Sequence, residues 1–170
     1  MADQPIPSQP GVTGPAGGQT GGTFPPFVLN NQYVRDLSFE VPKAPLIFAM
    51  LQERQPEIKI SVDVQVQALH ETLYEVCLKT KTDCNLGDQV AFILELAYAG
   101  LFTINVPKEK LHRTLLVDCP ALLFPFVRYI MADLTREGGF PPVMMGLVDF
   151  EAMFINEAKR QQAEAEGKTA

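Results

Sequence analysis

Several stretches of the chain alternate between apolar and polar residues with a period of two, the pattern of β-strands with one buried face. The most regular is IKISVDVQVQA, which begins at Ile58. A half-buried antiparallel strand accounts for all of it. The side chains expected to point inward are Ile58, Ile60, Val62, Val64, Val66 and Ala68. Those expected to point outward are Lys59, Ser61, Asp63, Gln65 and Gln67.

A first strand is expected from about Asn30, with an acidic outer face. One of its faces carries Tyr33, Arg35, Leu37, Phe39 and Val41, and the other carries Val34, Asp36, Ser38 and Glu40. It ends at PKAP, residues 42–45, and the apolar LIFAML that follows is expected to form a crossing loop or a short helix.

Two more strands follow a turn near His70 and a second turn at NLGD, residues 85–88. In the third strand the inward set is Tyr74, Val76, Leu78 and Thr80, and the outward set is Glu75, Cys77, Lys79 and Lys81. In the fourth strand the inward set is Val90, Phe92, Leu94, Leu96 and Tyr98, and the outward set is Ala91, Ile93, Glu95 and Ala97.

The apolar period then lengthens to that of an amphipathic helix, with Leu123, Phe126, Ile130 and Leu134 on one face. Proline is tolerated in a first helical turn, so the regular helix is expected from about Phe124, with Pro125 at its start. Gly138 or Gly139 is expected to end it. These four apolar residues are assigned mainly to core and subunit contact.

A last helix is expected to begin after Asp149, whose carboxylate can accept backbone N–H groups as an N-cap. Its narrow apolar stripe is lost beyond about Arg160, so residues 161–170 are expected to be a frayed polar tail. Four strands followed by two main helices predict an α+β fold.

The first 29 residues contain six Pro, six Gly and no Lys or Arg. Such a composition does not bury enough surface to offset the entropy of ordering, so residues 1–29 are expected to be a disordered tail. A single folded domain is expected over residues 30–160.

The charge is acidic, with 14 Lys and Arg against 20 Asp and Glu and a net charge of -6. Binding to nucleic acid or to an anionic membrane surface is therefore disfavoured. The apolar run Val90–Val106 is too short to span a bilayer, and the N-terminus lacks the features of a secretory signal. A cytoplasmic location is expected.

No set of residues describes an active site. Cys77, Cys84 and Cys119 match no zinc or redox spacing and are expected to be reduced, packed thiols. A Cys119 nucleophile with His112 as base has only Asp118 as a weak orienting group. No phosphate-binding glycine loop occurs, since the glycines of residues 10–22 follow no strand and open no helix. The protein is expected to be no enzyme and to use no metal or cofactor.

Apolar residues exceed what a small sheet needs, and two interpretations stay open: core and subunit contact, or a groove for extended apolar segments. Methionine and rotatable aromatic side chains suit such a groove because they adapt to varied sequences. The residues concerned include Phe24, Phe27, Leu46, Phe48, Leu51, Phe140, Met144, Met145, Met153 and Phe154.

Six segments in order resemble the SecB family of bacterial protein-export chaperones, over about Asn30 to Lys159. They are QYVRDLSFEVPKAP, QPEIKISVDVQV, LYEVCLKT, AFILELAYAGLFTI, CPALLFPFVRYI and GGFPPVMMGLVDFEAMF. The resemblance implies a homotetramer, built as a dimer of dimers, with helices between dimers and sheets outside. It also implies an ATP-independent cytosolic holdase that keeps precursor proteins unfolded and delivers them to the SecA motor ATPase.

By the same resemblance, the positions that bind SecA on the outer sheet face are Asp36, Glu40, Ile93 and Glu95. The groove for unfolded clients is implied at Leu46, Phe48, Leu51, Ile58, Ile60, Phe140, Met153 and Phe154. One departure is Arg54, where many relatives carry an aromatic residue shortly before QPE. Two alternatives are a SecB-like chaperone dedicated to an antitoxin, and a small-ligand-binding α+β domain that uses a cleft between sheet and helix.

Overall fold

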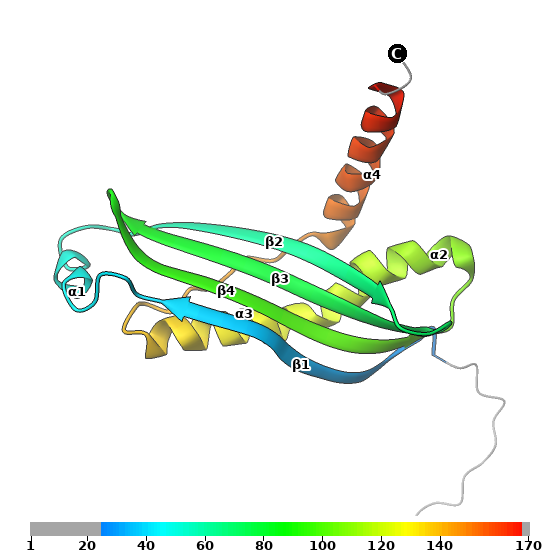
Figure 1. Ribbon diagram of the computed structural model, residues 1–170, viewed down its shortest axis with the longest axis horizontal. Helices are drawn as coiled ribbons and strands as arrows, with labels where there is room; N and C mark the ends of the chain where they lie inside the picture. The colour runs from blue at the N-terminus through cyan, green and yellow to red at the C-terminus, as the bar shows by residue number, and fades with distance from the viewer. Residues whose placement is uncertain (1–24, 168–170) are drawn as a thin grey trace, which may run out of the picture.

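The computed structural model describes residues 25–167, which form a four-stranded antiparallel sheet with helices on one of its faces (Figure 1). The strands lie in the order β1-β4-β3-β2, so β1 and β2 are the edges. Their bounds are Phe27–Glu40 for β1, Glu57–Ala68 for β2, Leu73–Leu86 for β3 and Gln89–Ile104 for β4. The expected α+β class with four antiparallel strands is confirmed.

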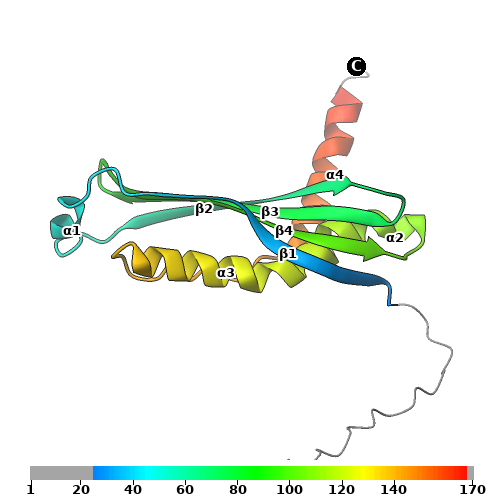
Figure 2. The ribbon, with the colours of Figure 1, turned by 60° about the horizontal axis from the view of Figure 1, so that its bottom comes forward.

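Helices follow the sheet, apart from the short α1 (Ile47–Met50) between β1 and β2. After β4, three helical segments run directly into one another: α2 (Lys108–Arg113), the π-helical turn η1 (Thr114–Asp118) and α3 (Cys119–Glu137). The last helix is α4 (Phe150–Gly167). Figure 2 shows α3 along one face of the sheet, whereas none of the helices within residues 25–167 lies along the other face, which we call the open face.

The core lies between the sheet and α3, where Phe92, Phe102, Leu94, Leu123 and Met131 are fully buried. The faces expected for β3 and for β4 from Phe92 to Tyr98 are confirmed, because their inward apolar side chains lie in this core. The equivalent face of β2 is less covered. Ile58 and Ile60 stay 41% and 36% exposed, although they belong to the inward set.

The two faces expected for β1 are wrong in one respect, and a β-bulge is the reason. The pairing with β4 shifts between Val34 and Asp36, so Arg35 is an extra residue in the strand. An extra residue reverses which face the following side chains use. Tyr33 therefore lies opposite Ala99 on the open face, and Phe39 lies opposite Leu94 on the core face.

The first strand also begins earlier than expected. Phe27 and Leu29, which fall within the expected tail, pair with Ile104 and Phe102 of β4. The rings of Phe27 and Phe102 lie 6.4 Å apart, so this apolar contact adds three residues to the sheet. Residues 1–24 lie outside the described part of the chain.

The expected helix start near Phe124 is wrong, because helical structure runs from Lys108 and Pro125 lies inside α3. His112 lies within α2. Proline leaves the carbonyl four residues earlier without its helical partner. Both Pro125 and Ala121 are exposed, so water can reach this side of the helix.

The buried stripe of α3 differs from the expected one as well. Leu123 is buried as expected, and Ile130 and Leu134 are half-buried against the core, but Phe126 is 42% exposed. The stripe on the sheet consists of Cys119, Leu123, Val127, Met131 and Thr135, spaced four residues apart. The helix does end as expected, since Gly139 adopts a φ of 84° that favours glycine.

Asp149 caps α4 as expected, since its Oδ1 accepts the backbone N–H of Ala152 at 2.8 Å. The helix continues to Gly167, past the expected fraying point near Arg160. It leads away from the sheet beyond the β2 edge (Figure 1). Residues 168–170 lie outside the described part.

One helical stretch within residues 25–167, Lys108–Glu137, is long and apolar enough to cross a membrane, with a mean hydropathy of 1.6. The apolar run Val90–Val106 of the sequence is not part of this stretch, since most of that run belongs to β4. The buried residues of Lys108–Glu137 pack on the sheet, as those of a core helix do.

Candidate functional site

The four positions expected on the outer sheet face come together on the open face at β1 and β4. Glu40 lies opposite Ile93, and Ser38 lies opposite Glu95. Asp36 follows one row further along, opposite Ala97. Asp36, Glu40 and Glu95 are exposed, so the two strands present a small acidic surface beside Ile93.

The bulge at Arg35 gives this acidic surface its direction. Without the extra residue, Asp36 and Glu40 would share the face opposite to Tyr33 and would point into the core. Contacts across the sheet hold the bulge in place. The Tyr33 hydroxyl donates to Glu75, and Arg35 Nη1 lies 2.6 Å from the other Glu75 carboxylate oxygen.

Two lysines of β3 lie beside the acidic surface. The sequence pattern did not predict that they would be its neighbours. Lys81 pairs with Glu95 in the sheet register, and its Nζ donates to Glu95 Oε1 at 2.8 Å. This hydrogen bond raises the pKa of Lys81. Lys79 lies opposite Ala97 and is exposed. Both were expected to point outward, but the neighbour of each depends on the strand register.

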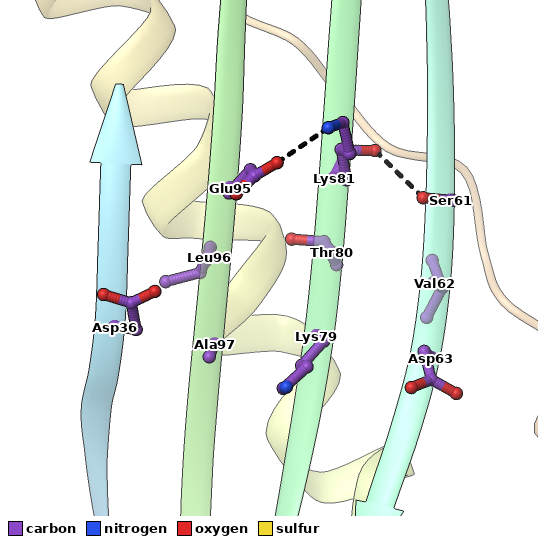
Figure 3. A pocket seen from close by; sticks show the side chains of 10 residues that line it. All are labelled: Asp36, Ser61, Val62, Asp63, Lys79, Thr80, Lys81, Glu95, Leu96 and Ala97. Atoms are coloured by element: carbon purple, nitrogen blue, oxygen red, sulfur yellow. Dashed lines mark hydrogen bonds and ion pairs between the residues drawn. The ribbon is translucent and has the colours of Figure 1, made fainter. Parts of the chain in front are cut away.

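The centre of this face is hollowed, because β4 contributes only the small side chain of Ala97 there. A depression of about 300 Å³ lies over it (Figure 3). It carries both charges, with Asp36 on the β1 side, Asp63 on the β2 side, and Lys79 and the Lys81–Glu95 pair on the two strands between them. The open face is therefore mixed in charge and not uniformly acidic.

The residues expected to form a client groove fall into two groups joined by β2. At one end, Phe48 of α1 is half-buried with its ring 5.4 Å from that of Phe140. Leu46 beside it is 78% exposed. Leu51 is half-buried in the same segment. Arg54 lies against the turn at Gly87.

The other group lies where α4 leaves the domain. Met153 and Phe154 line a concavity of about 270 Å³ with Val64 and Leu116. The inward face of β2 connects the two ends, since Ile58, Ile60, Val62 and Val64 follow one another on it. An extended strand rises about 3.3 Å per residue, so this apolar path spans about 20 Å.

Phe140 differs from the other expected groove residues, because it is only 5% exposed. Its ring packs against Phe39, Phe48 and Phe92. Its backbone N–H donates to the Thr135 carbonyl, which fixes the segment after α3. Phe140 therefore supports the groove from within the core and does not line its surface.

A second apolar surface lies on the side of α3 that faces away from the sheet. Tyr129 is exposed there, as are Met144 and Leu147 in the following segment. Phe126, also partly exposed, lies toward the sheet, with its ring stacked 6.0 Å from that of Tyr98 of β4. A hollow of about 460 Å³ runs between the helix and this segment. It includes Arg128, Asp133 and Arg136, so the surface combines apolar side chains with charged ends.

The geometry does not support Cys119 as a nucleophile with His112 as its base. Cys119 is fully buried, and this burial raises the pKa of its thiol to about 12. The thiolate needed for attack is therefore disfavoured. His112 packs edge-on against Phe154, with ring centroids 5.4 Å apart. Within residues 25–167, no three His, Cys, Asp or Glu side chains are grouped to hold a metal.

Comparison with known proteins identifies the class of this fold. The family model of SecB, described as preprotein translocase subunit SecB, matches residues 21–162. The protein-export protein SecB of Rhodospirillum rubrum is 47% identical over 145 residues, which cover 85% of this chain and 90% of that protein. That of Granulibacter bethesdensis is 46% identical over 176 residues, covering 98% and 99%.

Among solved structures, the fold resembles the SecB-like chaperone of Mycobacterium tuberculosis, determined with a ChAD peptide from the HigA1 antitoxin. The TM-score is 0.61 at 15% identity, over 72% of this chain and 91% of that one. The fold is thus that of a chaperone of the protein-export class. The chain belongs to the SecB family.

Proposed function

We propose that the protein is an ATP-independent holdase of the cytosol, which keeps precursor proteins unfolded and delivers them to the SecA ATPase. The observation that carries the proposal is the separation of two surfaces on one small domain. The apolar path of Ile58, Ile60 and Val64 uses the inward face of β2, whereas Asp36 and Glu95 lie on the open face. A client and a motor protein can then bind together.

Client binding follows from the chemistry of the apolar path. A segment of unfolded chain that covers Ile58, Ile60 and Phe154 removes apolar surface from water at about 25 cal/mol per Å². A folded protein hides the residues that the path binds, so selection needs no sequence code. Each contact is weak, and several grooves on one assembly bind a long client through effective concentration.

The assembly we propose is a homotetramer, a dimer of dimers, and the outer side of α3 supports it. Tyr129, Met144 and Leu147 are large apolar or aromatic side chains exposed around one hollow of the protomer. Phe126 of the same helix is 42% exposed. Surfaces of this kind commonly mark protein interfaces. A mass of about four times the protomer's 18.8 kDa is expected in solution.

SecA binding is proposed at Asp36, Glu40, Ile93 and Glu95. Exposed carboxylates steer a basic partner segment to the surface and make its association sensitive to salt. Among alternatives, a chaperone dedicated to an antitoxin has the support of the Mycobacterium tuberculosis fold match. The export role is preferred, because the relatives at 46 and 47% identity are named for protein export.

The test uses the purified chain, a chemically denatured client and SecA. The protein should suppress client aggregation without nucleotide, and Asp36→Lys or Glu95→Lys should weaken SecA binding while leaving this suppression intact. Glu71→Lys, in the exposed turn between β2 and β3, makes the same charge change away from the acidic surface. A monomer without effect on aggregation contradicts the proposal, and so does equal loss of both activities.

A further inference from the structure

The three carboxylates proposed to bind SecA differ in whether they already form an ion pair within the chain. Glu95 is already bound by an ammonium group of its own chain, Lys81 Nζ, at 2.8 Å (Figure 3). Within residues 25–167, no lysine or arginine lies within 4.0 Å of the carboxylate of Asp36 or Glu40. One of the three acids is thus occupied, and the other two can receive a cation directly.

The occupied pair is accessible to a competing cation. Both side chains are 49% exposed, and they lie at the edge of the depression over Ala97. Lys79, two residues along β3, projects from the same face. A basic side chain that approaches Glu95 therefore competes with Lys81, which holds Oε1, and approaches a second positive charge, Lys79, which lies opposite Asp63. Exposed ion pairs are weak enough for such an exchange.

We propose that Lys81 competes with the docking partner for Glu95, an inference that rests on the proposed SecA site. To bind Glu95, the partner displaces the Lys81 ammonium with a basic side chain of its own. The exchange replaces one ion pair by another, so Glu95 contributes less to affinity than Asp36 does. It keeps the complex reversible. It also favours arginine at the incoming position, because a guanidinium can hold a carboxylate with two parallel hydrogen bonds and an ammonium cannot.

The test compares Lys81→Gln with Lys59→Gln, each of which removes one positive charge from the open face. Lys59 lies on β2 beside Glu57, away from β1 and β4. We expect Lys81→Gln to lower the dissociation constant of the SecA complex about three- to fivefold at an ionic strength of about 0.1 M, as expected for an exposed pair. Lys59→Gln should change it less than twofold, because charges about a Debye length away are screened. The gain should shrink at high salt.

A double-mutant cycle separates competition for Glu95 from a general change in charge. In a Glu95→Gln background, the gain from Lys81→Gln should be mostly lost, and Lys81→Arg, which keeps the ion pair, should bind SecA much as the native protein does. Client holding reports that each variant is folded. If Lys81→Gln binds SecA with unchanged or lower affinity while Glu95→Lys weakens binding, the competitor role is wrong and the docking site stands. If Asp36→Lys and Glu95→Lys both leave SecA binding unchanged, the docking site itself is wrong.

Discussion

Arg35 of β1 and Glu75 of β3 form an ion pair with 2.6 Å between Nη1 and Oε2, although β4 lies between their strands. The contact passes over β4 beside Leu101, which lies opposite Glu75, because Ala97 and Ala99 of β4 have small side chains. Tyr33 packs on the same small cluster and donates to Glu75. The bulge of β1 is therefore tied to β3, which keeps Asp36 on the open face.

Glu75→Ala should lower the free energy of unfolding by about 1–2 kcal/mol, because Tyr33 and Arg35 both lose their acceptor. The value stays in this range because the Arg35 side chain is 47% exposed and can turn to water. Guanidinium denaturation monitored by circular dichroism measures it. Glu71→Ala, in an exposed turn, is the matched control and should change stability little. Equal effects of the two substitutions would refute a special role for Glu75.

Because of the Tyr33 phenol, the free energy of unfolding is expected to depend on pH in the alkaline range. Its hydrogen bond to Glu75 and, secondarily, its burial raise its pKa above the usual 10.0. Because the folded state favours the neutral phenol, its contribution is fully present below about pH 10 and is lost as the pH rises through the folded-state pKa. Tyr33→Phe should be about 0.5–1.5 kcal/mol less stable at neutral pH and should lose stability less steeply above pH 10. Parallel alkaline denaturation curves would contradict this.

Gly138 brings the end of α3 against β1. A Cβ added there would lie 2.2 Å from Phe39 Cε1, and the Phe39 ring has little room because it packs 5.5 Å from that of Phe92. Gly138→Ala should therefore cost about 1–3 kcal/mol of stability, as overpacking does. Gly146→Ala is the control, since nothing lies within 4 Å of its added Cβ. Thermal unfolding should separate the two variants clearly.

Much of the sheet follows from alternation alone, because a strand with one buried face repeats every two residues. Ile58 to Ala68 and Phe92 to Tyr98 are on the faces expected for them. The bulge at Arg35 has no comparable signature. Its extra residue looks like any other polar position, so Tyr33 and Phe39 share a face in the sequence pattern and lie on opposite faces in the sheet.

The start of the long helix could not be predicted from the local preference of proline. Pro125 favours a first turn by its own preference, but packing of Leu123 and Val127 on the sheet holds the helix through it. Tertiary contacts thus override a local cost.

Within the candidate site, Asp36 and Glu95 could be placed on one face from the sequence. The Lys81–Glu95 pair required the register between β3 and β4, which no single strand encodes.

The three cysteines should be protected from alkylation in the native protein. Burial raises the pKa of Cys84 to about 11 and that of Cys119 to about 12, and it also raises the pKa of Cys77. Since the thiolate is the reactive form, iodoacetamide near pH 8 should modify the denatured chain at all three positions and the native chain far more slowly. Intact-mass spectrometry counts the adducts. Rapid labelling of native Cys119 would revive the nucleophile interpretation.

The α4 end of the proposed client groove can be tested with two neighbouring residues. Phe154 lines the concavity with Val64 and Leu116, whereas Ile155 is 43% exposed and is not part of that lining. Removing an aromatic anchor from an apolar pocket typically costs more than 1 kcal/mol of binding. Phe154→Ala should therefore weaken capture of a denatured client about fivefold or more, and Ile155→Ala should have a smaller effect. Fluorescence anisotropy with a labelled unfolded client measures both affinities, and SecA binding should be unchanged in each. If Ile155→Ala proves as damaging as Phe154→Ala, clients contact the outside of α4 and not the concavity.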